Sequence, residues 1–299
     1  MKVRNKVEYI KLFLKGVFMG IADAVPGVSG GTIALLLGIY EELISTISGL
    51  NFGLIIDLKQ NGFKSFWNKL NGNFLITLIL GIGISLVSFI KISAGLLENY
   101  PLYVWSFFLG LILSAIYIIF KLIDSWNFIN IFSAFFMIIL SILITSNPIS
   151  GTENISLLHV LVSGIIAASA MILPGISGSL ILVILGVYKT LIDALDNLEI
   201  EIISSFLIGA IIGLLSFSKI LKWLFNNYKN LAYSIMLGLV IGSIEKIWPW
   251  KSENIIEITN SEISLSIVLT LTGVLLSLIH ISEPTRQEAI SYAVFGLKK

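Results

Sequence analysis

The chain consists of long apolar stretches separated by short polar ones. Three of these stretches, residues 74–92, 102–120 and 128–145, approach the length of about 20 apolar residues that a helix needs to cross a bilayer. Seven further apolar segments lie at roughly 9–25, 32–47, 157–173, 180–195, 202–221, 231–247 and 263–278. The pattern predicts an all-α membrane protein.

A short motif occurs twice in this pattern. Residues 26–30 read Pro-Gly-Val-Ser-Gly and residues 174–178 read Pro-Gly-Ile-Ser-Gly; each copy is followed by Leu-Gly-x-Tyr, ending at Tyr40 and Tyr188. An internal repeat in an apolar chain is typical of transporters built from two copies of one unit. We therefore predict a first repeat over 1–150 with its motif at 23–40, and a second over 151–276 with its motif at 174–188.

The apolar segments on either side of each motif are too short to span a bilayer. Lys11 and Lys15 interrupt the segment before the first motif, and Glu41 and Glu42 end the segment after it. We predict that each motif is the tip of a re-entrant hairpin of two half-length helices, because broken backbone at membrane depth must be buried or line a cavity. One hairpin and about three transmembrane helices per repeat give an odd number of crossings, which inverts the second copy.

Basic residues are distributed unevenly among the loops that this arrangement creates. The loops assigned to one side, 1–15, 51–73, 121–127 and 219–230, contain twelve Lys and Arg residues. The opposite loops contain four, Lys91, Lys189, Lys246 and Lys251. Because cytoplasmic loops are enriched in Lys and Arg, the N-terminus is expected in the cytoplasm.

Composition narrows the function classes. The chain is 56% hydrophobic and 12% charged, whereas an ordinary soluble domain carries roughly 25% charged residues. A net charge of +1 argues against nucleic acid as a partner. The absence of cysteine and the unrelated positions of the two histidines give no metal-ligand pattern, so neither a metal nor another cofactor is expected.

Each motif has the features of a turn that leads into a helix. Proline and glycine permit a tight reversal, serine is placed to cap the outgoing helix, and further glycines leave backbone N–H groups uncovered. A helix starting near Thr32 or Leu180 presents about half a positive charge at its first turn, which favours an anion. The expected anion-binding residues are Pro26, Gly27, Ser29, Gly30, Gly31, Thr32, Pro174, Gly175, Ser177, Gly178 and Ser179.

Two such helix ends would supply about one positive charge together, whereas a phosphomonoester carries about −1.5 to −2. The remainder requires hydroxyl donors, a proton or a cation. Neither motif contains an arginine, so Ser29, Thr32, Ser177 and Ser179 are the expected donors. An alternative is that the small residues only allow close helix packing in the membrane.

Asp23 is a carboxylate inside an apolar run, where burial in a membrane costs about 2.5–3.5 kcal/mol. The second copy has Met171 at this position, so the role of Asp23 is expected to be asymmetric. Coupling to protons or cations and orientation of the turn are both open. Each motif ends at a pair of residues that we call its mouth. Tyr40 of the first mouth aligns with Tyr188 of the second, and Glu41 aligns with Lys189.

Residues 23–32, the run Leu-Gly-Ile-Tyr-Glu-Glu that ends at Glu42, and residues 174–179 resemble the bacterial polyprenyl-phosphate transporter family, formerly a domain of unknown function. The resemblance extends over about residues 10–275. It implies a flippase of the bacterial plasma membrane that returns undecaprenyl phosphate for reuse as a lipid carrier in cell-wall synthesis. A transporter rather than an enzyme is therefore expected.

Two other functions remain as alternatives. A membrane prenyl-diphosphate phosphatase also uses a Pro-Gly-x-Ser motif, but that chemistry favours an arginine after the serine, where this chain has Gly30 and Gly178. A small-anion carrier or channel is the second alternative.

The C-terminal segment differs in character from the rest. From Leu276 it resembles an in-frame translation of a sequencing-library adapter. We expect residues 277–299 to be a non-native tail, so that His280 and Arg286 carry no function.

Overall fold

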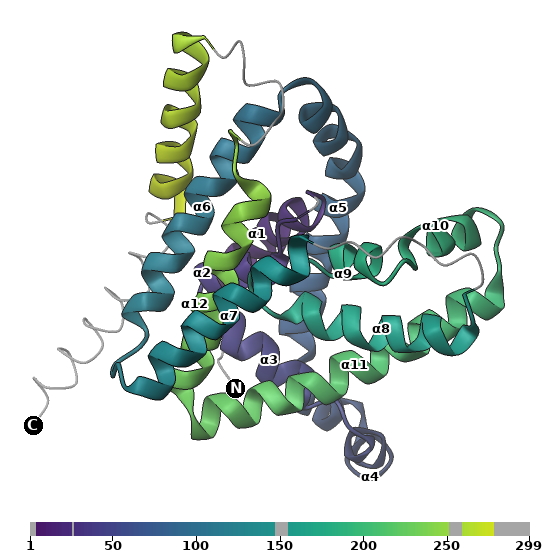
Figure 1. The fold of residues 1–299 in the computed structure, drawn as a ribbon. Coiled ribbons are helices and arrows are strands. Elements are labelled where there is room, and N and C mark those ends of the chain that lie inside the picture. Colours follow the sequence, from purple (N-terminus) through teal and green to yellow (C-terminus); the bar gives the residue numbers. More distant parts are fainter. Residues whose placement is uncertain (1–3, 26, 147–154, 251–258, 278–299) are drawn as a thin grey trace, which may run out of the picture.

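The computed structural model describes residues 4–25, 27–146, 155–250 and 259–277, and every regular element in these ranges is a helix (Figure 1). The helices are α1 (Lys6–Asp23), α2 (Gly30–Leu36), α3 (Tyr40–Ser48), α4 (Phe52–Lys69), α5 (Gly72–Asn99), α6 (Pro101–Lys121), α7 (Phe128–Ser146), α8 (Leu157–Ile172), α9 (Gly178–Ile184), α10 (Tyr188–Asp196), α11 (Ile200–Asn227), α12 (Lys229–Ile247) and a last helix, Asn260–Ser277. The all-α fold class is confirmed.

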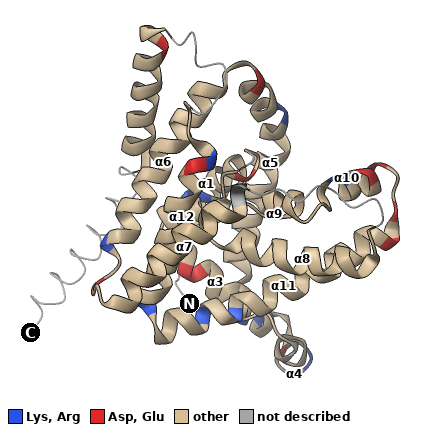
Figure 2. Cartoon of the chain, viewed as in Figure 1, with Lys and Arg blue, Asp and Glu red and all other residues tan. Residues whose placement is uncertain are grey.

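Five of the described helices are long and apolar enough to cross a membrane: α5, α6, α11, α12 and the last helix. Two helix pairs, α2 with α3 and α9 with α10, pass the same test together but bend by 119° and 104°. Counting each bent pair as one span gives up to seven. Acidic residues gather where α10 meets α11 (Figure 2).

Glycines bring the backbones of neighbouring helices into contact. A Cβ added to Gly16 of α1 would lie 2.5 Å from the Leu78 carbonyl oxygen of α5, and one added to Gly164 of α8 would lie 2.5 Å from the Phe206 carbonyl oxygen of α11. Small residues permit this close packing in lipid. Gly16 and Gly164 are 148 positions apart, as the two motifs are, so α1 on α5 and α8 on α11 are equivalent pairs.

A second type of pair links helices that are distant in the sequence. A Cβ on Gly238 of α12 would lie 2.3 Å from the Ala134 carbonyl oxygen of α7, and one on Gly110 of α6 would lie 2.0 Å from the Thr270 carbonyl oxygen of the last helix. The Ser114 hydroxyl of α6 also donates to the Val274 carbonyl oxygen, at 3.3 Å. Helix α7 of the first predicted repeat packs on α12 of the second, and the last helix of the second packs on α6 of the first (Figure 1). Each predicted repeat therefore contacts a helix of the other.

Helix α4 has no counterpart between α10 and α11. Its backbone departs from helical geometry at Gly62, which has a φ of +77°. The Asp57 carboxylate accepts hydrogen bonds from Lys69 and Asn61, and these bonds lower its pKa to about 2. The ion pair between Lys69 and Asp57 suits a segment that lies outside the apolar bundle.

The expected shape of the hairpins is wrong in two respects. Helix α1 is 18 residues long rather than half-length, and Lys11 and Lys15 lie inside it. The Lys15 ammonium donates to the Leu37 carbonyl oxygen at 2.6 Å, so a lysine in this helix gains a polar partner. The segment after each motif is also broken a second time, into α2 and α3 at Gly38 and into α9 and α10 at Gly186. These two glycines have φ of +67° and +71°.

Candidate anion site at the two repeated motifs

The first motif is a turn closed by the carboxylate of Asp23 at the end of α1. The Gly30 N–H donates to Asp23 Oδ1 at 2.7 Å. A Cβ on Gly30 would lie 2.4 Å from Asp23 Oδ2, so a side chain here would have to displace the carboxylate. Gly27 has a φ of +93°, a conformation in which glycine carries no steric penalty. Pro26 lies outside the described residues.

Ser29 joins this turn to the end of α8. As expected, its hydroxyl oxygen accepts from the Gly31 N–H at 3.2 Å and caps α2. The same hydroxyl donates to the Leu173 carbonyl oxygen at 3.3 Å. A Cβ on Gly31 would lie 2.7 Å from the Ile172 carbonyl oxygen, so glycine allows the two backbones to touch.

The second motif meets the first through a hydrogen bond between their turns. Pro174 is fully buried, and the N–H of Gly175 donates to Thr32 Oγ1 at 2.9 Å. Gly175 has a φ of +87° and packs against the backbone of Leu239 and Val240. Residues 143 positions apart are thus joined by a hydrogen bond inside an apolar protein.

The capping role predicted for Ser177 is wrong. Ser177 occupies the N-cap position of α9 but makes no side-chain cap hydrogen bond. Its hydroxyl instead lies 2.8 Å from the Ser179 hydroxyl. The two hydroxyls satisfy each other because the second copy has a serine at the position of Gly31. Both α2 and α9 begin at the glycine after the cap, Gly30 and Gly178, two residues earlier than expected.

The two mouths differ in their contacts. Tyr40 is buried, and its hydroxyl donates to the Ile172 carbonyl oxygen at 3.1 Å. Glu41 accepts from the Tyr233 hydroxyl at 2.5 Å and lies 3.2 Å from the Lys229 ammonium. Tyr188 is 43% exposed, and Lys189 beside it is exposed as well. The described residues thus give Tyr40 and Glu41 hydrogen-bond or ion-pair partners, whereas Tyr188 and Lys189 are exposed.

Lys246 lies at the first turn, although its sequence position gave no reason to place it there. Its Cε, Cδ and Cγ lie 3.3, 3.5 and 3.7 Å from the position that a Cβ on Gly27 would occupy. The sequence places Lys246 at the end of an apolar segment, and only the packing of α12 brings it to the motif.

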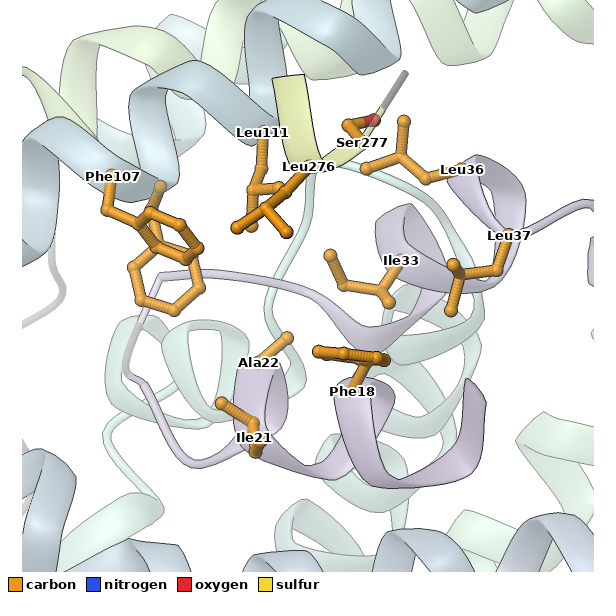
Figure 3. A pocket seen from close by; sticks show the side chains of 11 residues that line it. Phe18, Ile21, Ala22, Ile33, Leu36, Leu37, Phe107, Leu111, Leu276 and Ser277 are labelled. Carbon is orange, nitrogen blue, oxygen red and sulfur yellow. The ribbon is translucent and has the colours of Figure 1, made fainter. Parts of the chain in front are cut away.

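An apolar cavity of about 230 Å³ adjoins the first motif (Figure 3). It lies between α1, α2, α6 and the end of the last helix. Ten of its eleven lining residues are apolar. Ala22 precedes Asp23 and Ile33 follows Thr32, so the cavity is continuous in sequence with these polar residues.

The comparison with protein families gives a match over most of the chain. Residues 19–282 match the model of a family described as undecaprenyl phosphate translocase-like. The chain belongs to this family. The resemblance to polyprenyl-phosphate transporters inferred from the motifs is therefore confirmed, and both motifs lie inside the matched range.

Two curated relatives are named polyprenyl-phosphate transporter. The protein from Vibrio cholerae serotype O1 is 41% identical over 245 residues, which cover 82% of this chain and 79% of the relative. The protein from Staphylococcus aureus is 30% identical over 260 residues, which cover 81% of this chain and 87% of the relative. No solved structure matches the chain.

Proposed function

We propose that the protein is a flippase that moves undecaprenyl phosphate, or a related polyprenyl phosphate, across the bacterial plasma membrane for lipid-carrier recycling. The observation that carries this proposal is the hydrogen bond between the Gly175 N–H and Thr32 Oγ1. It joins a backbone N–H of the second turn to a hydroxyl of the first turn within an apolar helical protein, which supports a shared polar site. The names of the two relatives supply the substrate class.

The headgroup binds between the turns in this proposal. The phosphate oxygens replace the Thr32 hydroxyl as acceptor for the Gly175 N–H, and they accept from the hydroxyls of Ser29 and Thr32. Ser177 and Ser179 turn their hydroxyls from each other to the phosphate. Because the phosphate takes over the bonds that join the turns, binding weakens the link between the two motifs. The remaining proposed ligands are the motif positions Pro26, Gly27, Gly30, Gly31, Pro174 and Gly178.

The two parts of the chain act as inverted repeats, residues 1–150 and 151–276, with the N-terminus in the cytoplasm. The equivalent pairs α1 on α5 and α8 on α11 support a repeated unit, and the twelve-to-four distribution of basic residues supports the orientation. Alternation between the two mouths would carry the headgroup across. Residues 277–299 are proposed to be a non-native tail, and 278–299 lie outside the described residues.

Asp23 is proposed to couple transport to protons. Its carboxylate bonds the Gly30 N–H, so it is near the proposed headgroup, where two negative charges would repel each other. Binding then favours the protonated acid, and release on the cytoplasmic side returns the proton.

Transport without hydrolysis is the favoured chemistry. The phosphatase alternative needs an arginine after the motif serine, and a side chain at Gly30 would collide with Asp23. The relatives are named as transporters, in agreement with this proposal.

The test is a flipping assay in proteoliposomes that contain undecaprenyl phosphate. The purified chain should speed exchange of the lipid between leaflets relative to empty liposomes, and the Ser29→Ala/Ser177→Ala variant should not. Release of inorganic phosphate from undecaprenyl diphosphate would identify a phosphatase, and conductance without lipid movement would identify an anion channel.

A further inference from the structure

Lys246 lies half-buried in the last turn of α12. Its aliphatic stem crosses Gly27, with Cε 3.3 Å from the position of an added Cβ. The ammonium is one bond beyond Cε, so it is held next to the first turn. Any side chain at Gly27 would push this stem away.

The structure gives Lys246 no ion pair and no hydrogen bond among the described residues, unlike Lys229 and Lys69, which both pair with carboxylates. A charged side chain within a membrane-spanning segment is costly, and such residues usually pair with another group or serve a substrate pathway. Lys246 therefore makes no ion pair among the described residues, although its stem lies against the turn where we propose that an anion binds.

At the equivalent glycine of the second turn, the nearest described atoms are backbone atoms and not those of a lysine. An added Cβ on Gly175 would meet the backbone of Leu239 and Val240, at 2.8 Å. The lysine thus belongs to one turn only, as Asp23 does. A cation and a carboxylate at the same turn leave that turn with no net side-chain charge when it is empty.

We propose that Lys246 forms a cationic subsite for the dianionic phosphomonoester headgroup at the first turn. This inference rests on the proposed function, because it assigns a further binding residue to the same site. Lysine binds phosphate as a point charge, and a monoester carries about −1.5 to −2. The subsite distinguishes the lipid phosphate from the neutral prenyl alcohol with the same chain.

The experiment measures binding of two lipids to the purified full-length chain, undecaprenyl phosphate and undecaprenol, by native mass spectrometry. Lys246→Gln should weaken phosphate binding by about ten- to hundredfold, the effect of losing one charged hydrogen bond, and leave alcohol binding unchanged. Lys246→Arg should retain most of the phosphate binding. Lys219→Gln on α11, an exposed lysine, is the control and should behave as the parent.

Parental phosphate binding by Lys246→Gln would overturn the inference. If Ser29→Ala/Ser177→Ala weakens binding in the same assay, the proposed headgroup site stands and Lys246 is only an interfacial lysine. If neither variant weakens it, the proposed site fails as well. An equal loss for both lipids would assign Lys246 a structural role. Lys246→Met, which keeps an unbranched apolar stem, replaces Lys246→Gln should that variant be unstable.

Discussion

The two motifs have nearly the same sequence but different surroundings. All seven residues of α2 are buried, whereas Ile181 is the one buried residue of α9. Helix α2 contacts α1, α3, α6 and α8, while α9 contacts α8 and α10. The two turns share their backbone geometry, with φ of +93° at Gly27 and +87° at Gly175, so the motif sets the course of the backbone and the neighbours set the burial. A transporter with two equivalent turns can therefore present one of them enclosed and the other accessible.

The largest effect is expected from the serines. Ser29→Ala and Ser177→Ala should each weaken binding of polyprenyl phosphate by about 1.5–3 kcal/mol, because each removes a hydrogen bond to a charged group. Only Ser29 also caps its helix, so Ser29→Ala should cost a further ~1 kcal/mol of folding stability and Ser177→Ala should not. Lipid binding and thermal unfolding of both variants check this. Equal binding by the double variant and the parent would exclude both motifs from the site.

The next largest effect concerns the one motif position at which the copies carry glycine and serine. Gly31→Ser should destabilise the fold by about 1–3 kcal/mol, the usual cost of overpacking, because its Cβ would lie 2.7 Å from the Ile172 carbonyl oxygen. Ser179→Gly is the matched control and should change stability little, since Ser179 is exposed. Thermal unfolding in detergent measures both. A tolerated serine at position 31 would mean that the two turns can separate at little cost.

The first turn has a carboxylate, Asp23, where the second turn has Met171, and substitution of Asp23 tests what this difference does. Asp23→Asn preserves an oxygen that can accept from the Gly30 N–H and mimics the protonated acid. Lipid binding should therefore persist, while flipping should lose its response to an imposed pH gradient, at most tenfold per pH unit for one proton. The assay is lipid flipping in proteoliposomes with and without the gradient. Unchanged gradient dependence would leave Asp23 with a purely structural role.

The smallest effect concerns the two mouths. The chain contains no cysteine, so single cysteines can be labelled selectively. Tyr188→Cys should react readily with a water-soluble maleimide, and Tyr40→Cys slowly, because Tyr40 is buried. Adding Glu41→Gln should raise the rate at Tyr40→Cys about two- to fivefold, because the ion pair with Lys229 is worth up to about 1 kcal/mol. Equal rates at both cysteines would show that neither mouth is closed.

The sequence was sufficient for the helical membrane class and the repeated motifs, because apolar run length and motif spacing encode these directly. It was insufficient for the second bend at Gly38, although Leu-Gly-x-Tyr in both copies was an available signal. The different behaviour of Ser29 and Ser177 depends on neighbours, since Leu173 offers a carbonyl to one and Ser179 a hydroxyl to the other. Lys246 is 219 positions from Gly27, and no local pattern could join them.

The packing of α7 on α12 has a consequence for biosynthesis. Residues 147–228 are made between the two helices, which takes roughly 4–16 s at about 5–20 residues per second. During this interval the face of α7 that carries Ala134 and Ser141 has not yet met Gly238 and Gly242. Synthesis of α7 and its docking are therefore separate events in time, and a chain that stops between the two helices leaves this face of α7 without its partner.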